Sequence, residues 1–323
     1  MATRHPTIAR AGILSASCVL VLVASAGPGR ATFSGHNGRI VLQEDTAKHG
    51  VQLITAQPVT GAWRRVTDVA GFPVYPDWSP DGRHIAFEED SRSGDHCRIM
   101  LIRADGSGLT NLSHHRRGCE QNPSFTPSGR RIVFVVQRCM NCTERISSMN
   151  LRGHSLRRIV DSPPGMHSKD PNVAPNGKRL SFVAETEHNR AALFIVGIHG
   201  RGLRKIVPQS FDVERKHDWA PNGRRILFNN NANEADLPSN LMTIRPDGTH
   251  LRRVTHFTGG RPNPPKAHVG SYSPDGRWIV YRRTIGDRTK WFRRPVGPGL
   301  SREVTYRRGL VPSGNGDWGA AVR

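Results

Sequence analysis

Short apolar runs alternate with polar positions and end at glycine-containing turns along most of this chain. In residues 75–87, a short strand ending at Trp78 leads into a Pro-Asp-Gly turn, and a second strand then alternates up to Phe87. A period of two is typical of β-strands, and proline and glycine supply the backbone angles that tight turns need. The pattern predicts a β-hairpin.

This hairpin unit recurs at residues 122–134, 170–182, 217–228 and 270–281. Its turn glycines lie 46 to 53 residues apart, at Gly82, Gly129, Gly177, Gly223 and Gly276. A second alternating hairpin follows each unit, and residues 99–112 and 241–255 show it with Asp-Gly at the turn. Four strands repeated with a period of roughly 40 to 50 residues predict the blades of a propeller.

A sixth copy of the unit is divided between the two ends of the chain. Residues 37–42 carry a turn glycine and a second strand, whereas residues 317–319, Asp-Trp-Gly, carry a first strand. A ring of blades must pair its last sheet edge, because an unpaired edge is a template for aggregation. We therefore expect an all-β fold, a six-bladed β-propeller of four-stranded blades, in which N-terminal strands complete the C-terminal blade and close the ring.

The repeat also resembles a known family. Residues 77–87, Asp-Trp-Ser-Pro-Asp-Gly-Arg-His-Ile-Ala-Phe, and residues 102–106, Ile-Arg-Ala-Asp-Gly, are similar to the TolB-type propeller repeat, which is WD40-like. The resemblance extends over residues 32–323 and implies the fold, not a function. TolB itself carries an α/β domain before its propeller. The few residues between Ala31 and His36 leave no room for one, so we expect the propeller alone.

The first residues have the pattern of an export signal. Arg4 and Arg10 precede an uncharged apolar run, and residues 24–26, Ala-Ser-Ala, are small enough for cleavage. The run is shorter than the ~20 residues that span a bilayer. We expect residues 1–31 to be a signal peptide cleaved after Ala26 or Ala31, with no transmembrane span after cleavage. The mature domain, residues 32–323, would then be secreted or held in the cell envelope.

The charge indicates a class of partner. The 323 residues include 47 Lys and Arg against 26 Asp and Glu, a net charge of +21, and basic pairs such as Arg157-Arg158 recur in most repeats. Such a surplus attracts polyanions, which outside a cell are uronic or teichoic polymers and anionic lipid surfaces. Solvated outer strands, which would form a diffuse basic belt rather than a focused patch, also explain the pairs. We expect a monomer whose partner is a protein or an anionic cell-envelope polymer, and no specific nucleic-acid role.

Four cysteines follow the predicted signal peptide: Cys97, Cys119, Cys139 and Cys142. An even number in an exported chain favours disulfides, and three pairings are open. The spacing of Cys139 and Cys142 also suits half of a zinc site or a redox pair. The other two cysteines are 22 residues apart and form no second close pair, so we expect structural disulfides.

A polar residue precedes the first-strand aromatic or its equivalent in every copy: Asp77, Ser124, Asn172, Asp218, Ser271 and Asp317. The first strands are the innermost ones, so these side chains should line or rim the axial channel. The carboxylates there could hold a cation or a polar ligand. Alternatively, the side chains bond backbone groups within or between blades. We take Asp77, Asn172, Asp218 and Asp317, with His217, as candidate ligand-binding residues, and predict no cofactor beyond such a cation.

The histidines are also consistent with an enzymatic function. His167, His217 and His268 precede first strands in three successive repeats, and WD40-like lyases acting on acidic sugars bind metal through histidines near the channel. Histidines in solvated loops would give the same pattern. The chain has no Gly-x-Ser-x-Gly, phosphate-binding loop or His-Glu-x-x-His motif. We therefore favour an exported, non-catalytic scaffold that binds a protein or an anionic polymer through loops at one face of the ring, with a metal-assisted lyase or hydrolase of acidic polysaccharide as the alternative.

Overall fold

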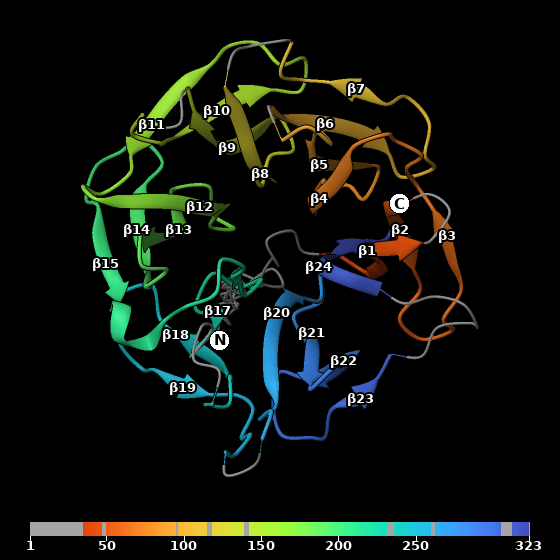
Figure 1. Ribbon diagram of the computed structural model, residues 1–323, viewed down its shortest axis with the longest axis vertical. Helices are drawn as coiled ribbons and strands as arrows, with labels where there is room; N and C mark the ends of the chain where they lie inside the picture. Colours follow the sequence, from red (N-terminus) through yellow and green to blue (C-terminus); the bar gives the residue numbers. More distant parts are fainter. Residues whose placement is uncertain are drawn as a thin grey trace, which may run out of the picture.

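Six four-stranded sheets form a closed ring in the computed structural model of the chain (Figure 1). The structure describes residues 35–46, 50–94, 96–114, 118–138, 142–230, 236–259, 262–304 and 312–322. Besides strands, these residues contain one short 3-10 helix, η1 (Gln209–Phe211). The predicted signal peptide lies outside the described residues. The all-β, six-bladed prediction is confirmed.

Each blade has four antiparallel strands in sequential order from the centre outward (Figure 1). The first strands are β4 (Phe72–Trp78), β8 (Cys119–Phe125), β12 (Met166–Val173), β16 (Asp218–Trp219), β20 (Lys266–Tyr272) and β24 (Pro312–Ala320). The second strands are β1 (Asn37–Thr46), β5 (His84–Asp90), β9 (Arg131–Gln137), β13 (Arg179–Thr186), β17 (Ile226–Asn229) and β21 (Trp278–Ile285). The third strands are β2 (Gly50–Ala56), β6 (Cys97–Arg103), β10 (Arg145–Asn150), β14 (Ala191–Gly197), β18 (Leu241–Ile244) and β22 (Arg288–Pro295). The fourth strands are β3 (Trp63–Arg65), β7 (Thr110–Asn111), β11 (Arg157–Asp161), β15 (Arg204–Val207), β19 (Arg252–Arg253) and β23 (Arg302–Glu303).

Strands from both ends of the chain build blade 1, which consists of β24, β1, β2 and β3. β24 pairs antiparallel with β1, with Trp318 opposite Ile40 and Asp317 opposite Val41. The Trp318 indole is buried, and its Nε1 donates a hydrogen bond to the Gly38 carbonyl at 3.3 Å. The predicted closure of the ring is therefore confirmed, and blades 2 to 6 follow in sequence order.

The apolar core consists of six clusters, each lying between two neighbouring blades. The alternation of the second strand explains this arrangement. Ile85 and Phe87 of β5 pack toward blade 1, against residues that include Val41, whereas Ala86 packs toward blade 3 with Phe125. Successive side chains of a strand point to opposite faces, so each blade contributes to the core on both of its sides.

A disulfide joins two blades. Cys97 on β6 in blade 2 is bonded to Cys119 on β8 in blade 3. Cys142 is also disulfide-bonded, and Cys139 lies outside the described residues. The prediction of a structural disulfide is confirmed, and of the three pairings left open the structure selects one that contains Cys97–Cys119. No helix in the described part of the chain is long and apolar enough to cross a bilayer.

The antiparallel order gives the ring two different faces. The turns between first and second strands and between third and fourth strands lie at one end of each blade, which we call the turn face. It comprises residues 79–83, 126–130, 174–178, 220–225 and 273–277, together with residues 57–62, 104–109, 151–156, 198–203, 245–251 and 296–301. The loops between second and third strands and between successive blades form the opposite surface, the loop face.

Replacing Trp318 by alanine tests the closure of the ring. The substitution removes a buried side chain at the junction of the two chain ends, and we expect it to lower the free energy of unfolding by about 3–5 kcal/mol. Trp63→Ala, on the outer strand of the same blade, is the control and should cost less because Trp63 is only partly buried. Equal unfolding curves for the wild type and Trp318→Ala in urea would contradict the account.

Candidate functional site

Hydrogen bonds near the ring axis connect each first strand with the next. In four of the six blades, the polar side chain that precedes the first-strand aromatic accepts a hydrogen bond from the backbone N–H of the equivalent aromatic in the following blade. These bonds join Asp77 Oδ2 to Phe125 N at 2.8 Å, Asp218 Oδ2 to Tyr272 N at 2.7 Å, Ser271 Oγ to Trp318 N at 2.7 Å, and Asp317 Oδ2 to Trp78 N at 2.9 Å. We call these four contacts the inter-blade clasps. They fix three of the predicted site residues, Asp77, Asp218 and Asp317, in place.

Asn172 and Ser124, at the two remaining described positions, behave differently. Asn172 Nδ2 donates to the backbone carbonyl of His217 at 3.2 Å, and the Trp219 indole donates to the carbonyl of Asn172. Both side chains are buried, yet Asn172 Oδ1 and Ser124 Oγ have no hydrogen-bond partner among the described residues. A buried polar atom without a partner costs stability, so these two oxygens are suited to accept or donate bonds to a ligand.

A second series of contacts involves Asn122 and Asp170, which lie two residues before Ser124 and Asn172 on the first strands. Asn122 and Asp170 sit at bulges with φ of 51° and 49°, a left-handed conformation that asparagine and aspartate tolerate better than other residues. Glu88 Oε2 accepts from Asn122 N at 2.8 Å, and Asn122 Oδ1 accepts from Asp170 N at 3.2 Å. Asp170 Oδ2 then accepts from His217 N at 3.1 Å. The bulges thus turn polar side chains toward the next blade, from blade 2 to blade 5.

Lys216 places a positive charge at the centre of the ring. Its side chain is 9% exposed, and its Nζ lies 4.0 Å from Asp170 Oδ1. Burial alone would lower the pKa of Lys216, but the carboxylates of Asp170, Asp317, Asp77 and Asp218 raise it above the usual value. These four carboxylates belong to four different blades, and only a group near the axis is close to all of them. The Lys216 ammonium therefore occupies the region for which the sequence predicted a cation; a bound cation there stays a prediction.

The carboxylates around Lys216 are not equivalent. Burial and the neighbouring Asp317 carboxylate raise the pKa of Asp77 well above its usual value. Burial would also raise the pKa of Asp170, but the Lys216 ammonium and hydrogen bonds from His217 hold it below the usual value. Asp170 is therefore held in its anionic form, whereas Asp77 takes up a proton more readily than an ordinary aspartate does.

Each of the three histidines lies beside a different carboxylate. His217 is fully buried, with Nδ1 3.3 Å from Asp170 Oδ2 and Nε2 2.7 Å from Ser181 Oγ. His167 Nδ1 lies 3.4 Å from Glu144 Oε1, and His268 Nδ1 lies 2.9 Å from Glu214 Oε1. The structure therefore does not bring His167, His217 and His268 together.

Among the described residues, one group of three potential metal ligands has its ligand atoms within 4.8 Å of one another: Glu88, Asp90 and Cys97. The sulfur of Cys97 is in the disulfide with Cys119, so it is not a thiolate ligand. None of the histidines that suggested metal chemistry belongs to this group.

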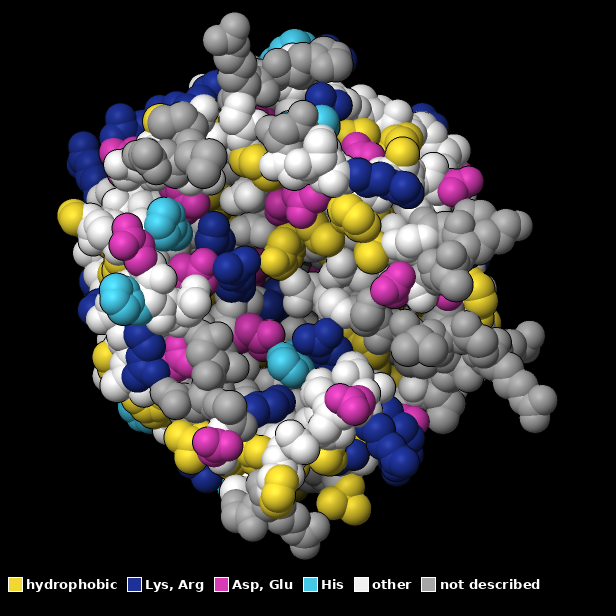
Figure 2. All heavy atoms as spheres, in the orientation of Figure 1, with side chains coloured by type: hydrophobic (Ala, Val, Ile, Leu, Met, Phe, Trp, Pro, Cys, Tyr) yellow, Lys and Arg dark blue, Asp and Glu magenta, His cyan; other side chains and the backbone are white. Residues whose placement is uncertain are grey.

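Charges of both signs surround the mouth of the ring on the loop face. Arg215 binds Glu185 at 2.9 Å, and Lys169 binds Glu144 at 3.3 Å. Glu144 Oε2, Glu214 Oε2 and Arg282 Nε are buried without hydrogen-bond partners among the described residues; we call these residues, with His167, Lys169, Glu185, Arg215 and His268, the mouth cluster. Figure 2 shows Lys and Arg, Asp and Glu, and His side chains gathered around the hollow at the centre of the ring.

Sequence reasoning located the first-strand polar residues but missed Lys216, Asp170 and most of the mouth cluster. The available signal was position: Lys216 and Asp170 each stand three residues before the last residue of a first strand. Asn122 occupies the same position, and its side chain also contacts the next blade, where Asp170 N donates to its Oδ1.

Replacing Lys216 by methionine should leave the central carboxylates without their compensating charge. We expect the free energy of unfolding at pH 7 to fall by about 3–5 kcal/mol, because removal of the ammonium leaves buried carboxylates without a compensating charge. In the variant, the carboxylate pKa values rise, so lowering the pH from 7 to 5 should restore stability as protons bind.

The wild type should behave differently. Asp170 has a lowered pKa, so its stabilising contribution is present at neutral pH and is lost only in acid, as the pH falls through that lowered pKa. Lys216→Arg retains the charge and is the control. Unfolding curves of Lys216→Met that do not change between pH 7 and pH 5 would contradict this electrostatic account.

Comparison with known proteins places the fold. The family model described as "TolB beta propeller domain" matches residues 45–269. An uncharacterized protein of Agrobacterium fabrum is 30% identical over 131 residues, covering 38% of this chain and 44% of that protein. The Tol-Pal system protein TolB of Francisella tularensis subsp. holarctica is 24% identical over 222 residues, covering 65% of this chain and 45% of that protein. The chain therefore spans under half the length of these curated relatives.

Solved structures agree on the architecture. TolB from Acinetobacter baumannii has a TM-score of 0.67 at 16% identity, covering 88% of this chain and 67% of that chain. An oligogalacturonate lyase in complex with manganese has a TM-score of 0.53 at 13% identity, covering 87% of this chain and 75% of that chain. At these identities the likeness shows the fold alone. The match over residues 45–269 shows more: the chain belongs to the TolB β-propeller family.

Proposed function

We propose that this protein is an exported, non-catalytic scaffold that binds a protein partner at the mouth of the ring on the loop face. The observation that carries this proposal is the mouth cluster, where buried charges of both signs lie beside polar atoms without partners. Propellers suit such a role because rigid blades present variable loops on one face.

The chemistry of the mouth favours a protein over an anionic polymer. A peptide offers amide donors and acceptors together with side chains of both charges, which match paired groups such as Arg215 with Glu185 and His268 with Glu214. A uniformly anionic polymer would meet the carboxylates of Glu144, Glu214 and Asp170 at the same place. Like charges brought together at an interface cost binding energy, so the mouth is poorly suited to that ligand.

The names of the relatives also support a protein partner. Several are named Tol-Pal system proteins, a name that places them in a system with other proteins. We do not propose lyase or hydrolase activity on acidic polysaccharide, because His167, His217 and His268 lie beside separate carboxylates in the described structure and none belongs to the one group of three potential metal ligands found there. Similarity to lyase structures at 13% identity concerns the fold alone.

Substitutions at the mouth should abolish partner binding. The mature domain, residues 32–323, would be immobilised and exposed to envelope proteins of the producing cell, with retained proteins quantified by mass spectrometry. We expect Arg215→Gln combined with His268→Gln to reduce the retention of a specific partner about ten-fold or more, as central interface residues do.

The matched control is Arg224→Gln combined with Arg277→Gln, which changes two exposed arginines of the turn face. It should retain the partner as the wild type does. The proposal fails if both double variants lose the same proteins, or if no retained protein distinguishes wild type from the mouth variant. Circular dichroism of each variant shows whether it is folded.

Export has its own test. When the full chain is expressed in a bacterium, we expect a protein outside the cytoplasm whose intact mass begins at Gly27 or Thr32, after cleavage behind Ala26 or Ala31. Replacing Ala24 and Ala26 by phenylalanine should block the first of these cleavages. Full-length protein that begins at Met1 and stays in the cytoplasm would refute export.

A further inference from the structure

We propose that the turn face binds an anionic lipid surface. This site lies on the opposite side of the ring from the mouth cluster and does not depend on the protein-binding function proposed above. Three features of the turn face carry the proposal: a concentration of exposed basic side chains, a repeated exposed leucine, and a pocket in blade 6 that is lined in part by a tryptophan, one of these leucines and one of these arginines.

Exposed basic residues are concentrated on this face. They occupy the turns and the strand ends beside them: Arg83, Arg103, Arg130, Arg152, Arg157, Lys178, Arg179, Arg201, Arg204, Arg224, Arg245, Arg252, Arg277 and Arg302. The antiparallel order of the blades places all of them at one end of the ring. Most of the basic pairs that are spread along the sequence therefore lie on one face of the ring.

The acidic residues of this face bond within their own turns. Asp81 accepts from Ser79 Oγ and from Arg83 N. Asp105 and Asp247 make the equivalent pair of bonds with the serine or threonine two residues later. These carboxylates are therefore held by the backbone of the turn. Arginines of this face also lie near one another: burial and the nearby Arg157 lower the pKa of Arg131.

An exposed leucine recurs at the end of the turn between the third and fourth strands in five blades. The residues are Leu109, Leu156, Leu203, Leu251 and Leu300, with exposed fractions of 44, 45, 40, 41 and 87%. In three adjacent blades the leucine is followed directly by two basic residues, as in Leu156-Arg157-Arg158. Single exposed leucines are ordinary, but the same one repeated beside basic pairs on one face makes that face amphipathic.

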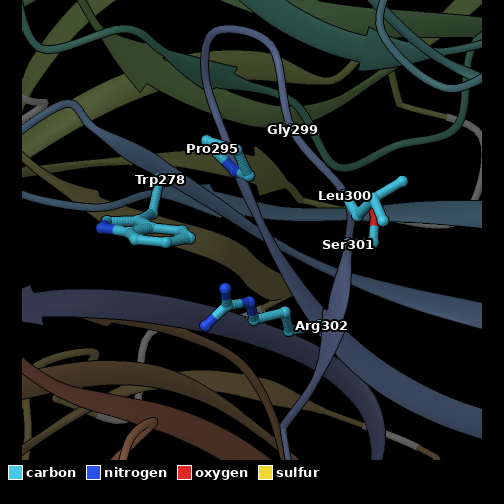
Figure 3. A pocket seen from close by; sticks show the side chains of 6 residues that line it. All are labelled: Trp278, Pro295, Gly299, Leu300, Ser301 and Arg302. Atoms are coloured by element: carbon cyan, nitrogen blue, oxygen red, sulfur yellow. The ribbon is translucent and has the colours of Figure 1, made fainter.

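A pocket of about 370 Å³ lies on the turn face of blade 6, beside Leu300 and Arg302. It is lined by residues that include Trp278, Pro295, Leu300 and Arg302 (Figure 3). Figure 3 shows the Leu300 side chain pointing away from the Trp278 ring, and the Arg293 guanidinium lies 5.1 Å from the centre of that ring. Tryptophan and arginine together are favoured at the headgroup level of a bilayer.

The apolar groups distinguish a bilayer from a soluble polyanion. Arginines alone suffice for a polyanionic chain, whereas the exposed leucines, and the exposed part of the partly buried Trp278, gain free energy only by entering an apolar phase. A lipid surface offers anionic headgroups and hydrocarbon at the same place, which matches both features.

The experiment compares two triple variants of residues 32–323 in flotation with vesicles of phosphatidylglycerol and phosphatidylcholine. Arg157→Gln, Arg201→Gln and Arg252→Gln remove charge from the turn face. Arg138→Gln, Arg190→Gln and Arg288→Gln remove the same charge from the loop face. Each arginine near an anionic surface contributes about a five-fold factor, so we expect the turn-face variant to lose roughly 100-fold in partitioning. The loop-face variant should bind nearly as the wild type does, and vesicles of phosphatidylcholine alone should bind neither.

A third variant tests the apolar contribution. We expect Leu156→Ser, Leu203→Ser and Leu251→Ser to weaken vesicle binding about ten-fold or more while leaving binding to soluble polyphosphate unchanged. Because serine at three half-exposed sites disturbs little of the core, circular dichroism should show a folded protein. Quenching by brominated lipid that is stronger in the wild type than in Trp278→Phe would support insertion without any change of charge.

Three results would overturn the proposal. Equal losses in the two arginine variants would mean that net charge alone drives binding. Unchanged vesicle binding by the leucine variant, together with competition by polyphosphate, would mean a site for soluble polyanions. Failure of the folded wild type to bind phosphatidylglycerol vesicles at low salt, where electrostatic attraction is least screened, would exclude the lipid site directly.

Discussion

A propeller has no hydrogen-bonded sheet joining one blade to the next, so its inner strands must be held together in another way. Here, in the four inter-blade clasps, a side-chain oxygen of one first strand accepts a hydrogen bond from a backbone N–H of the following first strand. The clasps satisfy amides that would otherwise be buried without partners. They also concentrate carboxylates near the axis, and Lys216, placed among them, offsets that charge. Ring closure and the charged centre are therefore consequences of the same residues.

The two faces of the ring differ because the turns are similar from blade to blade, whereas the loops are not. The turns are short and repeat nearly the same sequence, so a basic or apolar residue at one turn position recurs around the ring. The loops vary in length and are unlike one another, and they bring unrelated charged residues such as Arg215, Glu214 and Glu144 to one mouth. Repetition suits contact with an extended surface, and variation suits recognition of one partner.

Most of the fold could be predicted from sequence because its determinants are local. Alternation around Phe87, the glycine of each turn and the divided sixth copy specify strand, hairpin and ring closure without long-range information. The site was harder. The position of Asp77 on an inner strand followed from the repeat, but its bond to the next blade depends on how adjacent blades are rotated. Lys216 stands at the same place before the end of its first strand as Asn122 and Asp170, but the residue type at this place differs between repeats, so its role could not be predicted from the repeat. Cysteine pairing requires distances that spacing does not contain.

The central claim is that the inner carboxylates are structural clasps whose charge Lys216 balances. Hydrogen exchange of individual backbone amides, measured by NMR in the wild type and in Asp77→Ala, tests it most directly. The account predicts that the amide of Phe125 exchanges much faster in the variant, whereas those of Tyr272 and Trp318, held by Asp218 and Ser271, keep their protection. Equal protection of Phe125 in both proteins would show that the clasps do not hold the ring together and would contradict the account.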